Sequence, residues 1–191
     1  VPRLPVIDKI KKPIKLPPDK LKPKKPVFKE PIPKVPSKPF KEDCISFDYR
    51  KARVVKSGGR WKIAVGQMWL KDFGNKRDEA YRALKTIKHY KLTSQCFVGR
   101  PDPSLEYYLS NGNAPQGSFS GEDAIGFNPK KIQVKKANGR WKIVEGSHWI
   151  LDFGNKRGEA RKALKILKKY GFNHICFIGR PHASMTYFTK R

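Results

Sequence analysis

Gly59-Arg60-Trp61-Lys62-Ile63 recurs 80 residues further along the chain as Gly139-Arg140-Trp141-Lys142-Ile143. Extending the comparison outward from this stretch aligns residues 42–111 with residues 122–191 without a gap, and 34 of the 70 aligned positions are identical. Two copies are too few for a solenoid, in which at least three repeats stack. The chain is therefore a tandem duplication of one small domain.

The duplication divides the chain into four segments. Residues 42–111 form repeat domain 1 and residues 122–191 form repeat domain 2. Residues 112–121 between them are rich in Gly, Pro, Ser and Asn, which is typical of a linker. Residues 1–41 lie outside the repeat and hold 11 of the 16 prolines, so neither a helix nor a central strand is expected there.

Each copy has the sequence pattern of one helix and several short strands. In the first copy, Ala80, Ala83, Leu84 and Ile87 have the i, i+3, i+4, i+7 spacing of an amphipathic helix, which we expect over residues 76–90. Strands are expected over residues 45–47, 52–56, 60–65, 67–73, 95–100 and 105–109. This combination predicts an α+β fold, in which each copy packs an antiparallel sheet on one helix.

The Pro/Lys-rich segment 1–41 is expected to be an extended tail in polyproline II or coil conformation. Apolar residues recur through it, among them Ile7, Leu16, Phe28 and Ile32. Two interpretations remain open: a basic tail in solvent, or a strap that docks on a partner protein or on a neighbouring copy.

The chain is strongly basic, with 43 Lys and Arg against 16 Asp and Glu and a formal net charge of +27. The excess is not confined to the tail, because residues 42–191 hold 30 basic and 13 acidic residues. A field of this sign favours polyanions such as nucleic acid or acidic glycan. The predicted contacts are the basic positions that recur in both copies: Arg60, Lys62, Lys76, Arg77 and Arg100, with Arg140, Lys142, Lys156, Arg157 and Arg180.

These positions have different expected roles. Strand alternation puts Arg60 and Lys62 on the sheet face opposite Trp61, which is either a core residue or an exposed stacking platform. Lys76 and Arg77 stand at a helix start, where free backbone N–H groups can bind an anion. Arg100 either meets a ligand or holds its turn by pairing with Asp72, and the same alternatives apply to Arg180 and Asp152.

Cys44 and Cys96 lie on the first and fifth expected strands of copy one, and we predict a disulfide between them. Copy two keeps Cys176 but has Ala124 where Cys44 would be, so Cys176 is left without this partner. A disulfide is typical of an oxidising compartment. The three cysteines have no CxxC spacing, so neither a metal site nor a cofactor is expected.

We do not expect an enzyme. Asp72-Phe73-Gly74 matches a short motif of protein kinases, but the glycine-rich loop and the HRD motif of a kinase are missing from the sequence. None of the four histidines recurs at the equivalent position of the other copy. The sequence shows neither a nucleophile elbow nor a phosphate-binding glycine loop.

The pattern GRWKI…W-[LI]-x-DFGNKR…CF-[VI]-GRP resembles a short tandem domain of secreted or surface-associated bacterial proteins of uncharacterised function. The resemblance implies a secreted or cell-surface location and carries no activity.

The first functional hypothesis is thus a non-catalytic polyanion-binding module. The alternatives are a structural subunit of an extracellular assembly whose tail docks on neighbours, and a protease-inhibitor or lectin-like module that uses the turns after Gly99 and Gly179. No apolar run reaches the length of a transmembrane segment.

Overall fold

The computed structural model describes residues 41–191, so the predicted tail, apart from Lys41, lies outside the described residues. The first copy contains β1 (Asp43–Ser46), a short 3₁₀ helix (Tyr49–Lys51), β2 (Ala52–Ser57), β3 (Arg60–Val65), β4 (Met68–Gly74), α1 (Arg77–His89), β5 (Ser94–Val98) and β6 (Leu105–Leu109). The second copy contains β7 (Asp123–Gly126), β8 (Gln133–Ala137), β9 (Arg140–Glu145), β10 (His148–Asp152), α2 (Arg157–Tyr170), β11 (His174–Ile178) and β12 (Met185–Thr189). The α+β class, with two similar halves that each contain one helix packed on antiparallel sheets, is confirmed.

The strands of each copy form two three-stranded antiparallel sheets, where the sequence pattern predicted one. The first copy has the sheets β2-β3-β4 and β1-β5-β6, and the second has β10-β9-β8 and β12-β11-β7. The division arises because the helix separates β4 from β5 along the chain and β1 pairs with β5 instead of β2. We call β2-β3-β4 and β8-β9-β10 the outer sheets, and the other two the middle sheets.

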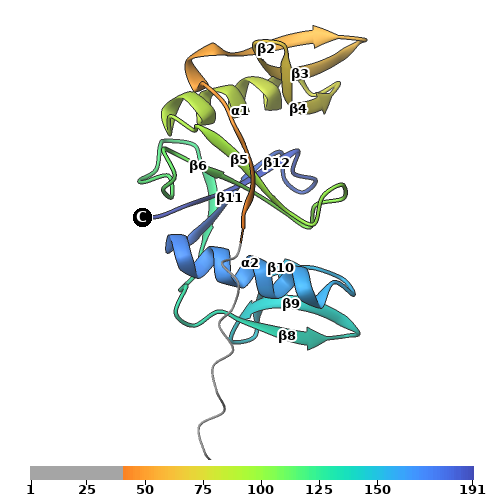
Figure 1. Ribbon diagram of the computed structural model, residues 1–191, viewed down its shortest axis with the longest axis vertical. Helices are drawn as coiled ribbons and strands as arrows, with labels where there is room; N and C mark the ends of the chain where they lie inside the picture. Colours follow the sequence, from red (N-terminus) through yellow and green to blue (C-terminus); the bar gives the residue numbers. More distant parts are fainter. Residues whose placement is uncertain (1–40) are drawn as a thin grey trace, which may run out of the picture. The chain divides into compact units, whose positions relative to one another are not determined.

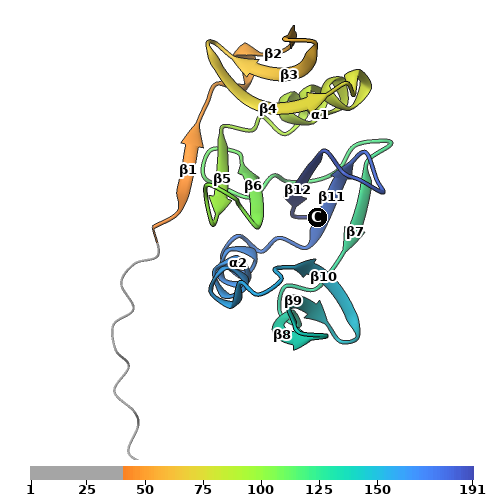
Figure 2. The same ribbon diagram turned by 90° about the vertical axis from the view of Figure 1, so that its right-hand side faces the viewer.

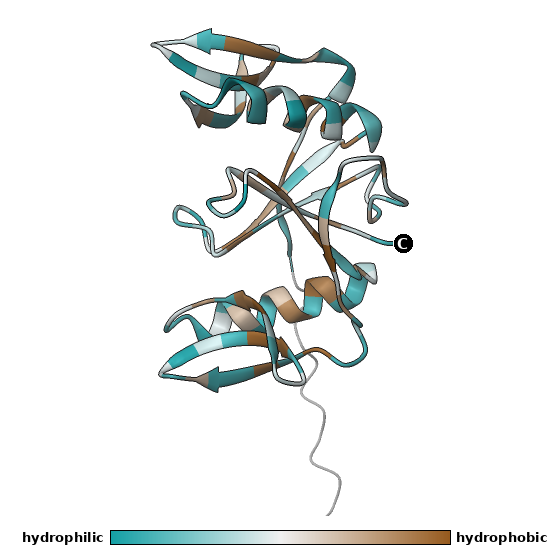
Figure 3. Ribbon diagram, turned by 180° about the vertical axis from the view of Figure 1, so that it is seen from behind, coloured by the Kyte–Doolittle hydropathy of each residue, from teal (hydrophilic) through white to brown (hydrophobic). Residues whose placement is uncertain are grey.

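Local sequence explains the turns and the helix ends. The hairpin between β8 and β9 turns at Asn138 and Gly139, which both have positive φ (50° and 75°), as the two-residue turns that match strand twist require. Helix α2 ends at Gly171 in the left-handed region, where its N–H bonds to the carbonyl of Leu167. Figure 3 shows hydrophilic and hydrophobic bands alternating along each helix, as the apolar stripe predicted.

Within residues 41–191 the elements are stacked in layers. Figures 1 and 2 show the outer sheet of copy one at one end, followed by α1, the strands of the middle sheets, α2 and the outer sheet of copy two. Each helix therefore lies between an outer sheet and the middle layer. The other face of each outer sheet is not covered by its helix.

The two hydrophobic cores each draw on both copies. Around α1, Ile63 and Phe73 of the outer sheet pack with Cys176, Ile178 and Tyr187 from β11 and β12 of the other copy. Around α2, residues of copy two pack with the buried side chains of β5 and β6 from copy one, Cys96, Val98, Leu105, Tyr107 and Leu109. Each helix is therefore enclosed by its own outer sheet and by strands of the other copy.

The predicted Cys44–Cys96 disulfide is present, with an S–S distance of 2.03 Å. The two cysteines face each other in the register of β1 and β5. In copy two the same register pairs Ala124 with Cys176, which is a buried free thiol. None of the helices in residues 41–191 is long and apolar enough to cross a membrane.

Candidate functional site

The uncovered face of each outer sheet carries the same row of side chains in both copies, and we call it the outer face. Strand pairing aligns Val55 with Lys62, Lys62 with Asp72 and Ala64 with Trp69. Paired residues point to the same side of an antiparallel sheet. The outer face of copy one consists of Arg53, Val55, Ser57, Arg60, Lys62, Ala64, Trp69 and Asp72, and that of copy two consists of Gln133, Lys135, Ala137, Arg140, Lys142, Val144, Trp149 and Asp152.

In copy one the row runs from an exposed indole to an ion pair. Trp69 is 58% exposed, and the Nζ atom of Lys62 lies 3.2 Å from its ring centroid. Lys62 is itself buried and lies 3.9 Å from the carboxylate of Asp72. Asp72 accepts a hydrogen bond from Arg60 Nε at 2.9 Å and another from the Gly74 N–H. These bonds, the one from Arg60 first, hold the pKa of Asp72 below its ordinary value.

Copy two repeats the row. Trp149 is 63% exposed and lies over Lys142, whose Nζ is 5.1 Å from the ring centroid and 3.7 Å from Asp152. Arg140 Nε donates to Asp152 at 2.8 Å. A hollow of about 440 Å³ adjoins this indole and is lined largely by apolar side chains, including Ile125, Phe127, Ile150, Ile175 and Phe177. Trp149 thus borders a largely apolar hollow.

The two tryptophans first considered as stacking platforms lie on the covered side of the outer sheets. Trp61 is half-buried against the core around α1, with the guanidinium of Arg77 5.6 Å from its ring centroid. Trp141 is in the same position near α2, with Arg157 at 4.8 Å. The core interpretation therefore holds for Trp61 and Trp141, and the predicted anion contacts Arg77 and Arg157 lie over these rings.

The helix starts contact the loop of the opposite copy. Lys76 Nζ donates to the carbonyl of His182 at 3.2 Å and to Ser184 Oγ at 3.3 Å. In the same way, Lys156 Nζ donates to the carbonyl of Asp102 at 3.0 Å. The carboxylate close to each Lys is Glu79 or Glu159 of the first helical turn. The lysine at each helix start is thus paired with a carboxylate of its own helix.

The same glutamates make close contacts with the glycines before the Arg-Pro turns. A Cβ atom on Gly99 would collide with the carboxylate of Glu159, and one on Gly179 would collide with that of Glu79. Both glycines also have positive φ (86° and 88°). Glycine at these positions therefore permits the helix of one copy to approach the turn of the other.

Arg100 and Arg180 hold their turns, but through a partner other than the predicted one. Arg100 pairs through two nitrogens with the carboxylate of Asp43, with Nε to Oδ2 at 2.6 Å, and Arg180 pairs in the same way with Asp123. Asp72 and Asp152, the expected partners, bind Arg60 and Arg140 instead. The reason is that β1 lies beside β5 in the middle sheet, which brings Asp43 opposite Phe97 and close to Arg100.

A glutamate at the start of each copy collects hydroxyl groups from both copies. Glu42 accepts hydrogen bonds from Tyr107 Oη at 2.8 Å and from Tyr170 Oη at 2.7 Å, and it pairs with Lys169. Burial alone raises the pKa of Glu42, but the hydrogen bonds from Lys169, Tyr170 and Tyr107 outweigh it and lower the pKa below its ordinary value. Burial raises the pKa of Tyr107. This cluster joins the two copies.

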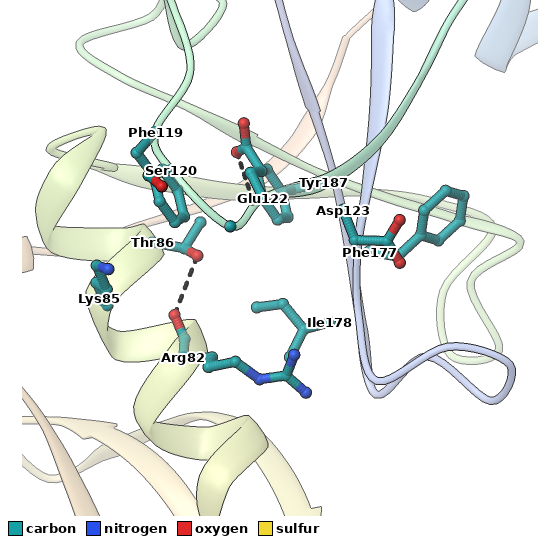
Figure 4. Close-up of a pocket in the computed structure, with 11 residues that line it drawn as sticks. Arg82, Lys85, Thr86, Phe119, Ser120, Glu122, Asp123, Phe177, Ile178 and Tyr187 are labelled. Carbon is teal, nitrogen blue, oxygen red and sulfur yellow. Dashed lines mark hydrogen bonds between the residues drawn. The ribbon is translucent and has the colours of Figure 1, made fainter.

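A cavity of about 250 Å³ lies between α1, the linker and the strands β11 and β12. Figure 4 shows Arg82, Lys85 and Thr86 of α1 on one side of it, and Glu122 hydrogen-bonded to Tyr187 on the other. Its volume is below the range of about 300–1,000 Å³ that is usual for small-molecule sites. The carboxylate of Glu122 in this cavity is already bound by three side chains, which are Tyr90, Tyr187 and Arg191.

Most carboxylates of residues 41–191 are engaged in ion pairs, and many cations are not. Within this range only Asp78, Asp102 and Glu145 form no ion pair. The exposed cations without an ion-pair partner among the described residues include Arg53, Lys56, Arg82, Lys85 and Lys88 in copy one, and Lys135, Lys136, Arg161, Lys162, Lys165 and Lys168 in copy two. The positive field therefore belongs to the helix flanks and to β2 and β8.

The ten predicted contacts are thus brought together only in part. Arg60, Lys62, Arg140 and Lys142 share the outer faces. Arg77 and Arg157 lie over Trp61 and Trp141, and Lys76 and Lys156 contact the opposite copy. Arg100 and Arg180 pair with aspartates of their own copies. Sequence reasoning missed Trp69 and Trp149 as exposed groups. Counting outward and inward positions from Phe73 places Trp69 inward, but a β-bulge at Leu70 reverses the alternation. The recurrence of this Trp in both copies was the sequence signal that could have marked it as a candidate site residue.

Comparisons with known proteins return no match among protein-family models, curated proteins or solved structures. The functional argument therefore rests on the outer faces and on the charge of the chain.

Proposed function

We propose that this protein binds polyanions without catalysis, through the two outer faces. The observation that carries the proposal is the exposed indole over a lysine, present at Trp69 and again at Trp149. Aromatic side chains of this size are usually buried, because they remove much apolar area from water. An exposed ring with neighbouring cations suits a ligand that has flat units and negative charge, such as single-stranded nucleic acid or an acidic polysaccharide.

The charge distribution supports the same function. Each row contains two cations and one carboxylate, and unpaired cations of β2 and β8, Arg53 and Lys135, lie on the same face. The paired Arg60 and Arg140 hold the rows in place, while the unpaired cations supply attraction over a longer range. An extracytoplasmic location is part of the proposal, since the Cys44–Cys96 disulfide is suited to an oxidising compartment.

The test is a titration of the protein with single-stranded oligonucleotides and with an acidic oligosaccharide, followed by tryptophan fluorescence. Affinity is expected to fall steeply with salt, because cations on the protein release counterions from the polyanion. The variant Trp69→Ala/Trp149→Ala keeps the net charge, and its affinity is expected to drop about tenfold or more, as stacking contributes roughly 1–3 kcal/mol per unit.

The matched control is Tyr81→Ala, which removes an exposed aromatic ring from α1, outside the outer face. It is expected to bind with the affinity of the unmodified chain. Equal affinity of the double Trp variant and the control, or affinity that does not change with salt, would refute the proposal.

A further inference from the structure

The hollow beside Trp149 is lined without a cation, although the chain is strongly basic. Its lining comes from β7, β10, β11 and the residues next to them, and it includes the aromatic rings of Phe127, Trp149 and Phe177. No Lys or Arg of residues 41–191 is part of it, and its polar side chains are His148 and Glu145. The volume of about 440 Å³ lies within the range of about 300–1,000 Å³ that is usual for small-molecule sites. The group that fits this hollow is therefore flat or apolar and carries no negative charge.

Glu145 gives the hollow a hydrogen-bond acceptor. It ends β9 and is paired in register with His148, the first residue of β10. Its Oε2 atom accepts a hydrogen bond from the N–H of Asn128 at 3.1 Å. Within residues 41–191, its Oε1 atom has no hydrogen-bond donor and the carboxylate has no ion-pair partner. A ligand with an N–H donor can therefore bond to Glu145, whereas an anionic group would be repelled by it.

Exposed cations lie close to the hollow without lining it. Lys142 Nζ lies 5.1 Å from the ring centroid of Trp149, and the register pairs Lys142 with the exposed Lys135 of β8. The turn that follows β7 carries Lys130 and Lys131, which are also exposed and form no ion pair within residues 41–191. The site thus combines an apolar hollow that contains one acceptor with cations outside it.

We propose that this hollow binds one base of a single-stranded nucleic acid, whose amino group donates a hydrogen bond to Glu145. The inference rests on the proposed function and selects one of its two ligand classes. A base is flat and uncharged, and the sugar separates it from the phosphate, so the base can enter while the phosphates stay near the cations. In an acidic polysaccharide the acid group is attached to the sugar ring itself, so a ring that entered would bring its charge to Glu145. The apolar lining would also leave the hydroxyls of a sugar without partners.

The duplication provides an internal comparison. Copy one has Val65 and Met68, paired in the same way, where copy two has Glu145 and His148. It keeps the exposed indole at Trp69. Both outer faces therefore retain the features of the proposed polyanion site, while the acceptor for an amino group is a feature of copy two.

The experiment titrates the full chain with oligomers of equal length and one negative charge per unit, followed by tryptophan fluorescence. The oligomers are oligo(dC), oligo(dU), an abasic oligonucleotide and oligogalacturonate. Cytosine has an amino group where uracil has a carbonyl oxygen, so oligo(dC) is expected to bind about fivefold or more tightly than oligo(dU). The abasic oligonucleotide is expected to bind about tenfold or more weakly than oligo(dC), because it has no ring to stack.

The variant Glu145→Val places the residue of copy one in copy two, and its matched control is Asp102→Asn. Each removes one negative charge, so simple electrostatics raises the affinity of both variants for every polyanion. The preference for oligo(dC) over oligo(dU) is expected to fall below about twofold in Glu145→Val and to persist in Asp102→Asn. Circular dichroism checks that both variants are folded, which is expected because Val65 occupies the equivalent strand position and Asp102 is exposed.

The outcomes separate the two proposals. Equal affinity for oligo(dC), oligo(dU) and the abasic oligonucleotide, or a preference for cytosine that survives in Glu145→Val, would overturn the base site and leave the proposed function standing. Tighter binding of oligogalacturonate than of oligo(dC) would also overturn it, since the ligand would then be an acidic polysaccharide. Failure of all four oligomers to bind would refute the proposed function, and the base site with it.

Discussion

At the scale of single residues, Glu122 shows how the copies are joined. Its side chain is 2% exposed and pairs with Arg191. It accepts hydrogen bonds from Tyr90 of copy one at 2.7 Å and from Tyr187 of copy two at 2.6 Å. Glu42 has the equivalent partners Tyr170 and Tyr107. A buried carboxylate with several donors is tolerated because its hydrogen bonds replace those lost to water.

We predict that Glu122→Ala destabilises the protein by about 2–3 kcal/mol, because two tyrosine hydroxyls and Arg191 lose their acceptor in a buried site. The free energy of unfolding in urea measures the effect. Asp102→Ala, at an exposed position of a turn, is the control and is expected to change stability by less than about 0.5 kcal/mol. Equal stability of the two variants would contradict the role of Glu122.

Glu42 makes stability depend on pH. Its folded pKa lies below the ordinary value of 4.5, so its contribution is complete above pH 4.5 and is lost as the pH falls from there through the folded pKa. The free energy of unfolding in urea is measured for the unmodified protein and for Glu42→Gln between pH 7 and pH 3. The unmodified protein is expected to be more stable by a constant amount above about pH 5, and by a shrinking amount below pH 4.5. The other carboxylates are common to both proteins, so a gap that does not change with pH would rule out this assignment.

At the scale of elements, β1–β5 and β7–β11 are the same strand pair with different chemistry. The register joins Cys44 to Cys96 in one and places Ala124 opposite Cys176 in the other. Burial raises the pKa of Cys176 to about 11, so its thiol stays protonated and unreactive near neutral pH. The disulfide is therefore a property of one residue position on a shared scaffold.

We predict that Ala124→Cys forms a second disulfide with Cys176. A thiol titration of the unreduced protein in denaturant is expected to fall from one free thiol per chain to none. The loop of 52 residues equals that closed by Cys44–Cys96, and the gain is expected to be about 2–4 kcal/mol, measured by urea unfolding. The reverse change, Cys44→Ala, is the matched control, because it places Ala opposite Cys in β1–β5, as Ala124 and Cys176 are placed in β7–β11. Retention of a free thiol in Ala124→Cys would show that the two strand pairs are not equivalent.

At the scale of the whole described unit, the exchanged strands make the two copies one cooperative structure. The core around α2 is completed by Val98 and Tyr107 of copy one, and the core around α1 by Ile178 and Tyr187 of copy two. Loss of either core removes the surface on which the other is built. Duplicated domains with separate cores would unfold independently instead.

We predict that Phe172→Ala, which empties a fully buried site in the core around α2, lowers the protection of α1 and α2 together. The expected cost is about 3–5 kcal/mol. Native-state hydrogen exchange measures both helices, and the mirror variant Leu92→Ala in the core around α1 is expected to affect both in the same way. Unchanged protection of α1 in Phe172→Ala would show that the copies fold separately.

Local patterns in the sequence predicted much of this structure. The helix stripe, the hairpin at Asn138-Gly139, most strand limits and the Cys44–Cys96 pair all depend on residues close in the chain or on one pair of neighbouring strands. For the candidate site, the recurring Arg60 and Lys62 were correctly placed on the uncovered face. The exposure of Trp69 was not predictable, because a bulge at Leu70 reverses the side to which it points.

The sequence by itself determined the duplication, the α+β class and the basic character of the protein, because repeats, periodicity and charge are properties of the chain alone. Only the tertiary structure decided which residues complete each core and that Lys76 contacts the opposite copy. It also decided that β1 pairs with β5, which brings Asp43 to Arg100. Two nearly identical copies offer nearly identical partners, so periodicity cannot distinguish contacts within a copy from contacts between copies. The packing of the whole unit selects the contacts between copies, since they bury both helices on two sides.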